Sequence, residues 1–287
     1  MISPEKVAAI VTTFHPSAAI VRNLERIAKQ VLIVIVVDDT GTGTPIPELV
    51  NAGIGNVVLL RNEKNVGIAA ALNSGVRHAA QLGCDWVVTF DDDTLISETY
   101  VDDIAAFAGA WGCGRPLGVI ACSRVPHLTS SKGHGGYKFK RTLITSGSMF
   151  SIDTYRKVGG FDETFFIDLV DFDFCLRIRR LGLEVVQLDK PGMDHKVGNI
   201  KLISVFGKKF IAYNHSPFRL YYQTRNVFLF LRKHFRFDPW LSLYLLGDVF
   251  RVPLRVIFFE QDKKLRFRHV FFGIKDGFLN RGGRLVQ

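Results

Sequence analysis

The sequence has few cysteines and no long uncharged segment. Its four cysteines, among 287 residues, include no CxxC pair, which argues against a zinc-binding fold or a disulfide framework. No window of 18 residues lacks a charged side chain, which argues against a polytopic membrane protein. No basic segment precedes the first apolar run, so we expect a buried first strand of a cytoplasmic protein there rather than a signal peptide.

The composition is typical of a folded protein, but the charge is unevenly distributed. With 47% hydrophobic and 22% charged residues, the chain is not a disordered one. Residues 1–195 carry 19 Lys and Arg against 22 Asp and Glu, whereas residues 196–287 carry 18 against 5 and hold 19 of the 34 aromatic residues. The basic, aromatic C-terminal region is expected to meet something anionic, or else to neutralise an acidic cleft of the body.

The first half of the chain alternates strand-like and helix-like segments. Strands are expected at 7–13, 31–37, 57–60 and 86–90, and helices at 17–30 and 66–82. Such alternation of continuous apolar strands with helices is typical of a mainly parallel sheet covered on both faces. Further helices are expected at 170–181, 215–235, 240–259 and 265–280, with a strand at 184–188.

Three consecutive aspartates, Asp91, Asp92 and Asp93, follow the fourth expected strand. Adjacent carboxylates repel one another unless a cation or hydrogen-bond donors compensate their charge. In an extended chain Asp91 and Asp93 point to the same side, and such a pair of oxygen ligands suits Mg²⁺ or Mn²⁺. The alternative is that one acid caps the segment after Thr94. The position at a strand end favours the metal.

Other polar residues follow strands or open helices. Asp39, after the second strand, can bind a ribose hydroxyl or a base N–H, or it can simply be a turn residue. The helix that begins after Asn65 can bind a phosphate at its N-terminus, or its alanines can simply allow tight packing. Three acids crowd the start of the helix at 170–181, namely Asp168, Asp171 and Asp173. The helix dipole favours acids there, but one of them can instead be a general base. His195 is either structural or completes a metal site.

Taken in order, these motifs resemble those of glycosyltransferase family 2 enzymes with the GT-A fold. The matching motifs span residues 7–195 and are Thr12-Thr13, Val37-Asp-Asp39, Asn65-x-Gly67, Asn73-x-Gly75, Asp91-Asp-Asp93, Gly147, Gly159-Gly-Phe-Asp162, Val170-Asp-x-Asp173 with Leu176-Arg177, and His195. Within the family the chain is most similar to bacterial rhamnosyltransferases, on the segments 165–177 and 215–226 and on Leu72, where many relatives carry Arg. At the catalytic step it has Val170 where most relatives have Glu.

The resemblance implies an α/β architecture and a set of residue roles. Residues 1–195 would form a GT-A domain with a Rossmann-like, mainly parallel central sheet flanked by helices, and residues 196–287 a helical extension. The residues implied to bind the nucleotide sugar are Thr12, Asp39, Asn65, Asp91 and Asp92. Those implied to bind Mg²⁺ or Mn²⁺ are Asp91, Asp93 and His195. Asp171 is implied to be the base, without the neighbouring Glu.

The implied reaction is inverting transfer of L-rhamnose from dTDP-β-L-rhamnose to a hydroxyl of a lipid-linked or polysaccharide acceptor in cell-envelope glycan synthesis. Similar enzymes often extend glycans on polyprenyl diphosphate carriers, so the C-terminal helices are expected to meet an anionic membrane surface at its inner face. The candidate contacts are Arg232, Lys233, Arg236, Arg251 and Arg255. Alternatively, these helices pack as an ordinary core or against a second copy of the chain.

Three other functions stay open at this point. The donor can be another nucleotide sugar, carrying galactofuranose, glucose or galactose. A nucleotidyltransferase is disfavoured, because no basic Gly-rich loop follows the first strand. A nucleic-acid-binding protein is suggested by the basic C-terminal region, but the three aspartates have no role in binding a polyanion, so no nucleic-acid partner is expected.

Overall fold

The computed structural model describes residues 2–41, 53–112, 114–124, 136–195, 201–205, 208–212, 215–259 and 261–285. It divides into two compact units. The first comprises Met1–Phe161 and Phe174–Lys196, and the second Asp162–Asp173 and Val197–Gln287. The helix α6 (Val170–Arg180) starts in the second unit and continues in the first.

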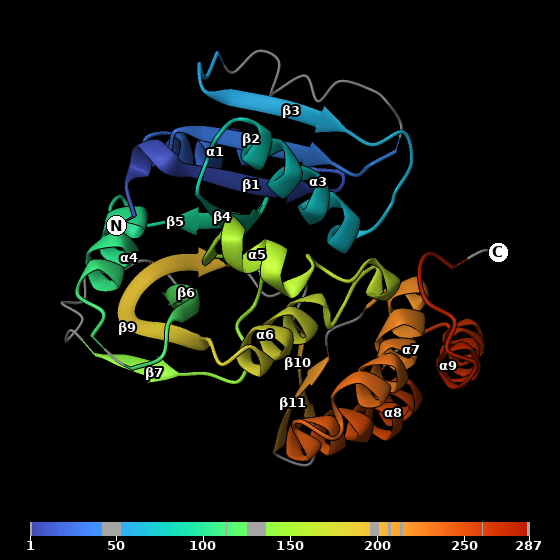
Figure 1. Cartoon of the computed structure of the whole chain (residues 1–287). Helices are drawn as coiled ribbons and strands as arrows, with labels where there is room; N and C mark the ends of the chain where they lie inside the picture. Colours follow the sequence, from blue (N-terminus) through green and yellow to red (C-terminus); the bar gives the residue numbers. More distant parts are fainter. Residues whose placement is uncertain are drawn as a thin grey trace. The chain divides into compact units, whose positions relative to one another are not determined.

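The first unit is built on a nine-stranded mixed sheet (Figure 1). Its strands are β1 (Val7–Thr13), β2 (Ile33–Asp38), β3 (Val57–Arg61), β4 (Trp86–Asp91), β5 (Thr94–Ile96), β6 (Leu117–Arg124), β7 (Tyr137–Phe139), β8 (Ser148–Ser151) and β9 (Glu184–His195). The order is β3-β2-β1-β4-β8-β6-β9-β5, with β7 also paired to β9. The expected parallel pairing holds for β3, β2, β1 and β4 and again for β6 with β9, whereas β8, β5 and β7 pair antiparallel to their neighbours.

Helices cover both faces of this sheet, because the central strands are apolar on both sides. The helices of the first unit are α1 (Ile20–Ala28), α3 (Ile68–Gln81), α4 (Tyr100–Gly109) and α5 (Ile152–Val158), and a 3₁₀ turn, η1 (Pro4–Lys6), precedes β1. All seven residues of β1 are buried, and alternate ones face opposite sides. Val11 shares a core cluster with Ile27 of α1, whereas Ile10 contacts α3, where a Cβ on Gly75 would lie 2.4 Å from its Cγ2.

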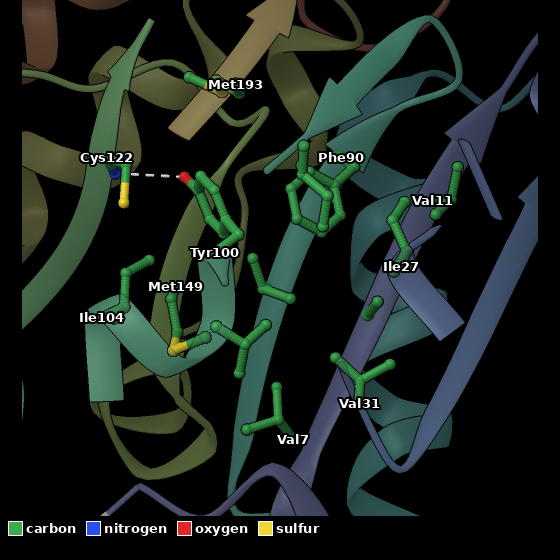
Figure 2. Close-up of a cluster of buried hydrophobic side chains, with 14 of the residues drawn as sticks. Val7, Val11, Ile27, Val31, Phe90, Tyr100, Ile104, Cys122, Met149 and Met193 are labelled. Atoms are coloured by element: carbon green, nitrogen blue, oxygen red, sulfur yellow. Dashed lines mark hydrogen bonds between the residues drawn. The ribbon is translucent and has the colours of Figure 1, made fainter. Parts of the chain in front are cut away.

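The core cluster beside α1 and α4 also orders the loop before β8 (Figure 2). In it, Tyr100 of α4 contacts Phe90 edge to face, with ring centroids 5.7 Å apart. The Tyr100 hydroxyl accepts a hydrogen bond from the Cys122 amide and donates one to the Gly147 carbonyl oxygen, at 3.2 and 2.6 Å. Gly147 has φ 82°, and a Cβ there would lie 2.5 Å from the Tyr100 hydroxyl, so the loop needs glycine.

The second unit is mainly helical. Its elements are the 3₁₀ turn η2 (Glu163–Phe165), the hairpin β10 (Lys201–Val205) and β11 (Lys208–Ala212), and the helices α7 (Pro217–His234), α8 (Pro239–Phe259) and α9 (Lys263–Phe278). The three helices lie where the sequence predicts them, and the hairpin is an addition. Glycines let α9 approach α7 closely, since a Cβ on Gly273 would lie 2.1 Å from Thr224 Oγ1. Over the described residues, we find no helix that is both long and apolar enough to cross a membrane.

Candidate active site

The carboxyl ends of three neighbouring strands bring most of the predicted donor-site residues of the first unit together. Thr12 of β1 lies opposite Val37 of β2 on one side and opposite Asp91 of β4 on the other. Thr13 lies opposite Asp38. This edge of the sheet is where ligands bind in open α/β folds, and it is formed here by residues far apart in the sequence.

The three aspartates form a turn rather than an extended segment. Asp91 ends β4, Asp92 and Asp93 lie in a turn, and β5 begins at Thr94. The argument from strand alternation, which placed Asp91 and Asp93 on one side, therefore does not apply to Asp93. The turn is held from β1 and α1, since the Thr13 hydroxyl donates to Asp92 Oδ2 at 2.7 Å and Asn23 Nδ2 donates to the Asp92 carbonyl oxygen at 2.8 Å.

Burial and the neighbouring carboxylate both affect the ionisation of Asp92 in this turn. Burial raises the pKa of Asp92; the hydrogen bond from Thr13 opposes this shift, and the negative charge of Asp93 adds to it. Asp93 is exposed and Asp91 is half-buried. A positive charge bound at the turn would relieve this repulsion and lower the pKa of Asp92.

Ser146 is a site residue that the sequence analysis missed. Its buried hydroxyl accepts a hydrogen bond from the Asp91 amide at 3.2 Å and lies 2.6 Å from the Thr94 hydroxyl. Ser146 thus fixes both ends of the acidic turn. Its only signal in the sequence is its position beside Gly147, a family motif.

The strand β9 is curved (Figure 1) and ends at His195, beside the same turn. The backbone of His195 pairs with that of Thr94 in β5, directly after the three aspartates. The side chain of His195 lies outside the described part of the structure. Among the side chains that are described, no group of three or more His, Cys, Asp or Glu residues is placed to hold a metal ion.

Asp39 holds the loop that leads into α3. Its buried carboxylate accepts hydrogen bonds from Asn62 Nδ2 at 2.9 Å, from the Val66 amide at 2.8 Å and from the Gly67 amide at 2.9 Å. The side chain of Asn65 accepts a further bond from the Gly67 amide at 3.1 Å. The amides of Val66 and Gly67, which precede α3, are therefore held by Asp39.

The acids at the start of α6 have different surroundings in the second unit. Asp168 forms an ion pair with Arg219 of α7, Nη2 to Oδ1 at 2.9 Å. Asp173 is fully buried and contacts His234 Nε2 at 2.8 Å and Lys233 Nζ at 2.5 Å. Asp171 is half-buried, and its Oδ1 accepts a hydrogen bond from the amide of the next residue at 2.9 Å. Two of the three acids thus hold α6 to α7.

The helix α8 has an apolar face exposed to solvent. Its exposed large apolar residues are Trp240, Leu243, Tyr244, Phe250, Leu254, Ile257 and Phe258. At about 100° per residue, these positions fall on one side of the helix. The opposite side is buried and includes Leu241, Leu245, Val252 and Val256. Trp240, Phe250 and Phe258 are 74%, 68% and 70% exposed, which is unusual for such side chains.

The exposed face of α9 mixes apolar and basic residues. Its members are Lys264, Leu265, Arg268, Phe271, Phe272, Lys275 and Phe278. Among the predicted basic contacts, Arg232, Arg236 and Arg251 are exposed, and Arg251 forms an ion pair with Asp248 of the same helix, Nε to Oδ1 at 2.9 Å. Arg232 donates to the Phe278 carbonyl oxygen and Lys233 binds Asp162, so both have roles within the unit. The side chain of Arg255 lies outside the described residues.

Comparison with known proteins identifies the family. Residues 8–143 match the family model described as Glycosyl transferase family 2. Over 240 residues, the chain is 30% identical to the dTDP-rhamnosyl transferase RfbF of Shigella flexneri. The alignment covers 79% of this chain and 80% of that protein. The chain therefore belongs to glycosyl transferase family 2 and is a glycosyltransferase. The expected similarity to bacterial rhamnosyltransferases is confirmed.

Solved structures of glycosyltransferases share the fold at low sequence identity. S. aureus TarS 1–349 matches with a TM-score of 0.55 and 15% identity, covering 95% of this chain and 80% of that one. GalNAc-T7, solved with UDP, GalNAc and Mn²⁺, matches with a TM-score of 0.58 and 13% identity, covering 92% and 55%. These similarities confirm the GT-A fold with a helical C-terminal region.

Proposed function

We propose that this glycosyltransferase moves L-rhamnose from dTDP-β-L-rhamnose to a hydroxyl group of a lipid-linked or polysaccharide acceptor, with inversion at the anomeric carbon. The observation that carries the proposal is the 30% identity, over 79% of the chain, to a dTDP-rhamnosyl transferase. The match to the family model over residues 8–143 includes the ends of β1, β2 and β4, from which the donor site is argued below.

The donor is proposed to bind at the carboxyl ends of β1, β2 and β4, with Thr12, Asp39 and Asn65 at the nucleoside. A carboxylate has about four lone-pair positions, and three donors already use that of Asp39. One position is left for a ribose hydroxyl or a base N–H. Asp39 therefore has two roles in the proposal, since it also holds the loop that carries Asn65. Asp91 and Asp92 complete the donor site.

The acidic turn fits Mg²⁺ or Mn²⁺. Asp91 and Asp93 offer the hard oxygen ligands that these cations prefer, and the backbone of His195 pairs next to them. The adjacent negative charges of Asp92 and Asp93, which a cation would compensate, are a second reason to expect a cation there. Mn²⁺ in the GalNAc-T7 structure, which has the same fold, also supports a divalent cation. When bound, the cation would neutralise the diphosphate leaving group.

Asp171 is proposed to take the proton of the acceptor hydroxyl. The acceptor oxygen attacks the anomeric carbon, the bond from that carbon to the diphosphate oxygen breaks, and dTDP leaves. The β-linked donor thereby gives an α-L-rhamnoside, and the proton passes to the Asp171 carboxylate. Asp171 is chosen among the three acids for its place at the start of α6, two residues before Asp173, within the segment that resembles the family's catalytic segment.

The proposal includes an anionic membrane surface, at its inner face, as a partner of the second unit. The exposed side of α8 gathers seven large apolar residues, whereas an ordinary solvated surface has them scattered singly. On α9, exposed Phe residues alternate with Lys and Arg, and the helix has one acid, Asp276, which the Tyr221 hydroxyl binds at 2.8 Å. Such a face suits the headgroup region, where aromatic rings are buried and cations meet lipid phosphates.

Vesicle binding tests the membrane partner. The protein should sediment with phosphatidylglycerol vesicles at low salt, be released at high salt, and bind neutral phosphatidylcholine vesicles weakly. Trp240→Ser combined with Phe258→Ser should reduce binding. Phe139→Ser, in the first unit and 56% exposed, is the matched control and should not. Absence of binding to any vesicle contradicts the proposal, as does a dimer in light scattering that the paired substitutions dissociate.

A nucleotide-sugar panel tests the donor. Saturating ligand at about 100 times its Kd stabilises a protein by about 2.7 kcal/mol, which a thermal-shift assay detects. We expect dTDP-β-L-rhamnose with Mg²⁺ or Mn²⁺ to raise the melting temperature more than the UDP-linked galactofuranose, glucose and galactose donors do. A larger shift with one of those donors, and none with dTDP-rhamnose, would overturn the assignment of the sugar.

A further inference from the structure

The loop before Asp171 has an unusual backbone. Phe166, Asp168 and Leu169 have φ of 63°, 65° and 62°, although none of them is glycine. Such residues persist only where their surroundings hold them. The helix α6 begins directly afterwards, with the Asp173 amide bonded to the Leu169 carbonyl oxygen at 2.9 Å. The conformation of the loop 166–169 therefore sets where α6, and with it Asp171, begins.

Asn226 of α7 binds this loop along its length. Its Nδ2 donates to the carbonyl oxygens of Phe165, Ile167 and Asp168, at 2.9, 2.6 and 2.9 Å. The side chain is fully buried. These acceptors lie before and after Phe166, the first residue of the loop with positive φ. One side-chain amide therefore fixes the path of the loop.

Arg225, the preceding residue, fixes the orientation of that amide. Its Nε donates to Asn226 Oδ1 at 2.9 Å, which leaves the Nδ2 group of Asn226 directed at the loop. Its Nη2 donates to the carbonyl oxygens of Thr164 and Phe165, both at 2.9 Å. The guanidinium is fully buried and lies 4.6 Å from the ring centroid of Tyr222, which in turn stacks on Phe166 of the loop.

We propose that Asn226 and Arg225 are positioning residues for transfer, because they hold the loop 166–169 in the conformation that sets the place of Asp171. The inference rests on the proposed role of Asp171 as the base. Arg225 and Asn226 are the last two residues of the segment 215–226, which resembles rhamnosyltransferases. The proposal gives this segment a role, whereas the reaction steps described above do not. The alternative is that the pair only stabilises the second unit.

A double-mutant cycle separates these two roles. Asn226→Ser and Asp171→Asn are made singly and together, and kcat, the donor KM and the melting temperature are measured for each. A base displaced by about 1 Å loses about 100-fold in rate, so we expect Asn226→Ser to lower kcat by between about 10-fold and 100-fold with an unchanged donor KM. In the Asp171→Asn background, the second substitution should cost nothing further, because there is no base left to misplace.

The control is Thr224→Val, on the same helix and equally buried, with its hydroxyl directed at the Leu220, Tyr221 and Val270 carbonyl oxygens. It should lower the melting temperature and leave kcat unchanged. If Asn226→Ser does not fold, Arg219→Gln, which removes the partly exposed partner of Asp168, takes its place in the cycle. An equal fold-loss in both backgrounds overturns the positioning role. Full turnover of Asp171→Asn alone instead overturns the proposed base.

Discussion

Removing the Asp39 carboxylate should release the loop that leads into α3. In Asp39→Ala the Val66 amide loses its acceptor, and the Gly67 amide keeps only its 3.1 Å bond to Asn65 Oδ1. A buried polar group left unpaired costs about 1–3 kcal/mol, so the unpaired Val66 amide should lower the free energy of unfolding by about 1–3 kcal/mol, and the loss of one of the two Gly67 acceptors should add less. Urea unfolding measures this loss, and hydrogen exchange of the Val66 and Gly67 amides shows whether it is local to the loop.

The neighbouring residue offers a matched control. Asp38 is as buried as Asp39, but among the described residues its carboxylate accepts one hydrogen bond, from the Thr40 amide to Oδ1 at 3.0 Å. Asp38→Asn keeps that acceptor and should cost less than about 1.5 kcal/mol. Unchanged exchange at Val66 and Gly67 in Asp39→Ala would refute the idea that the carboxylate holds the loop. Affinity for the donor should fall in Asp39→Ala, since Asn65 lies in the released loop.

Three further predictions concern the metal, the base and the packing of α3. Asp93→Ala should abolish transfer, and a chelator should abolish wild-type activity until Mg²⁺ or Mn²⁺ is restored. Full wild-type activity in the presence of a chelator would contradict the metal assignment. Asp171→Asn should lower turnover by about 10²–10⁴ with near-normal donor affinity in calorimetry; if Asp168→Asn or Asp173→Asn does so instead, the base is misassigned. Gly75→Ala should destabilise the fold by about 1–3 kcal/mol in urea, because its Cβ would meet Ile10 at 2.4 Å, whereas Gly109→Ala, with open space, should not.

The elements best predicted from the sequence are those with one clear pattern. The strand expected at 7–13 is β1 without a change of bounds, because a β-branched run buried on both faces has no competing structure. The helix expected at 215–235 is α7 (Pro217–His234), and it begins where Ser216 caps it. Amphipathic periodicity and a cap are local features, so the sequence contains them.

The elements that the sequence analysis missed depend on distant partners. β5 and β7 have three residues each, too few for a periodic pattern, and exist because β9 pairs with both. β9 itself was expected to end near residue 188, since Pro191 and Gly192 conceal its second half. Gly192 is needed there, because a Cβ would lie 2.3 Å from that of Cys122, more than 60 residues earlier.

The candidate site follows the same division. The aspartates at strand ends could be found from the rule that ligands bind at the carboxyl ends of parallel strands. The partners of these carboxylates could not be predicted, because Asp168 binds Arg219 and Asp173 binds His234, which lie 51 and 61 positions later in the chain. The turn at Asp92 and Asp93 was also hidden, since three acids in a row have no distinctive local geometry.

The most direct test of the central claim is transfer itself. Lipid-linked glycans extracted from the organism that carries this chain are incubated with the protein, a divalent cation and isotopically labelled dTDP-β-L-rhamnose, and the anomeric carbon of the product is examined by NMR. The account predicts a labelled α-L-rhamnoside that is absent with Asp171→Asn. Transfer from a UDP-linked sugar in place of dTDP-rhamnose, or a product that keeps the β configuration, would contradict it.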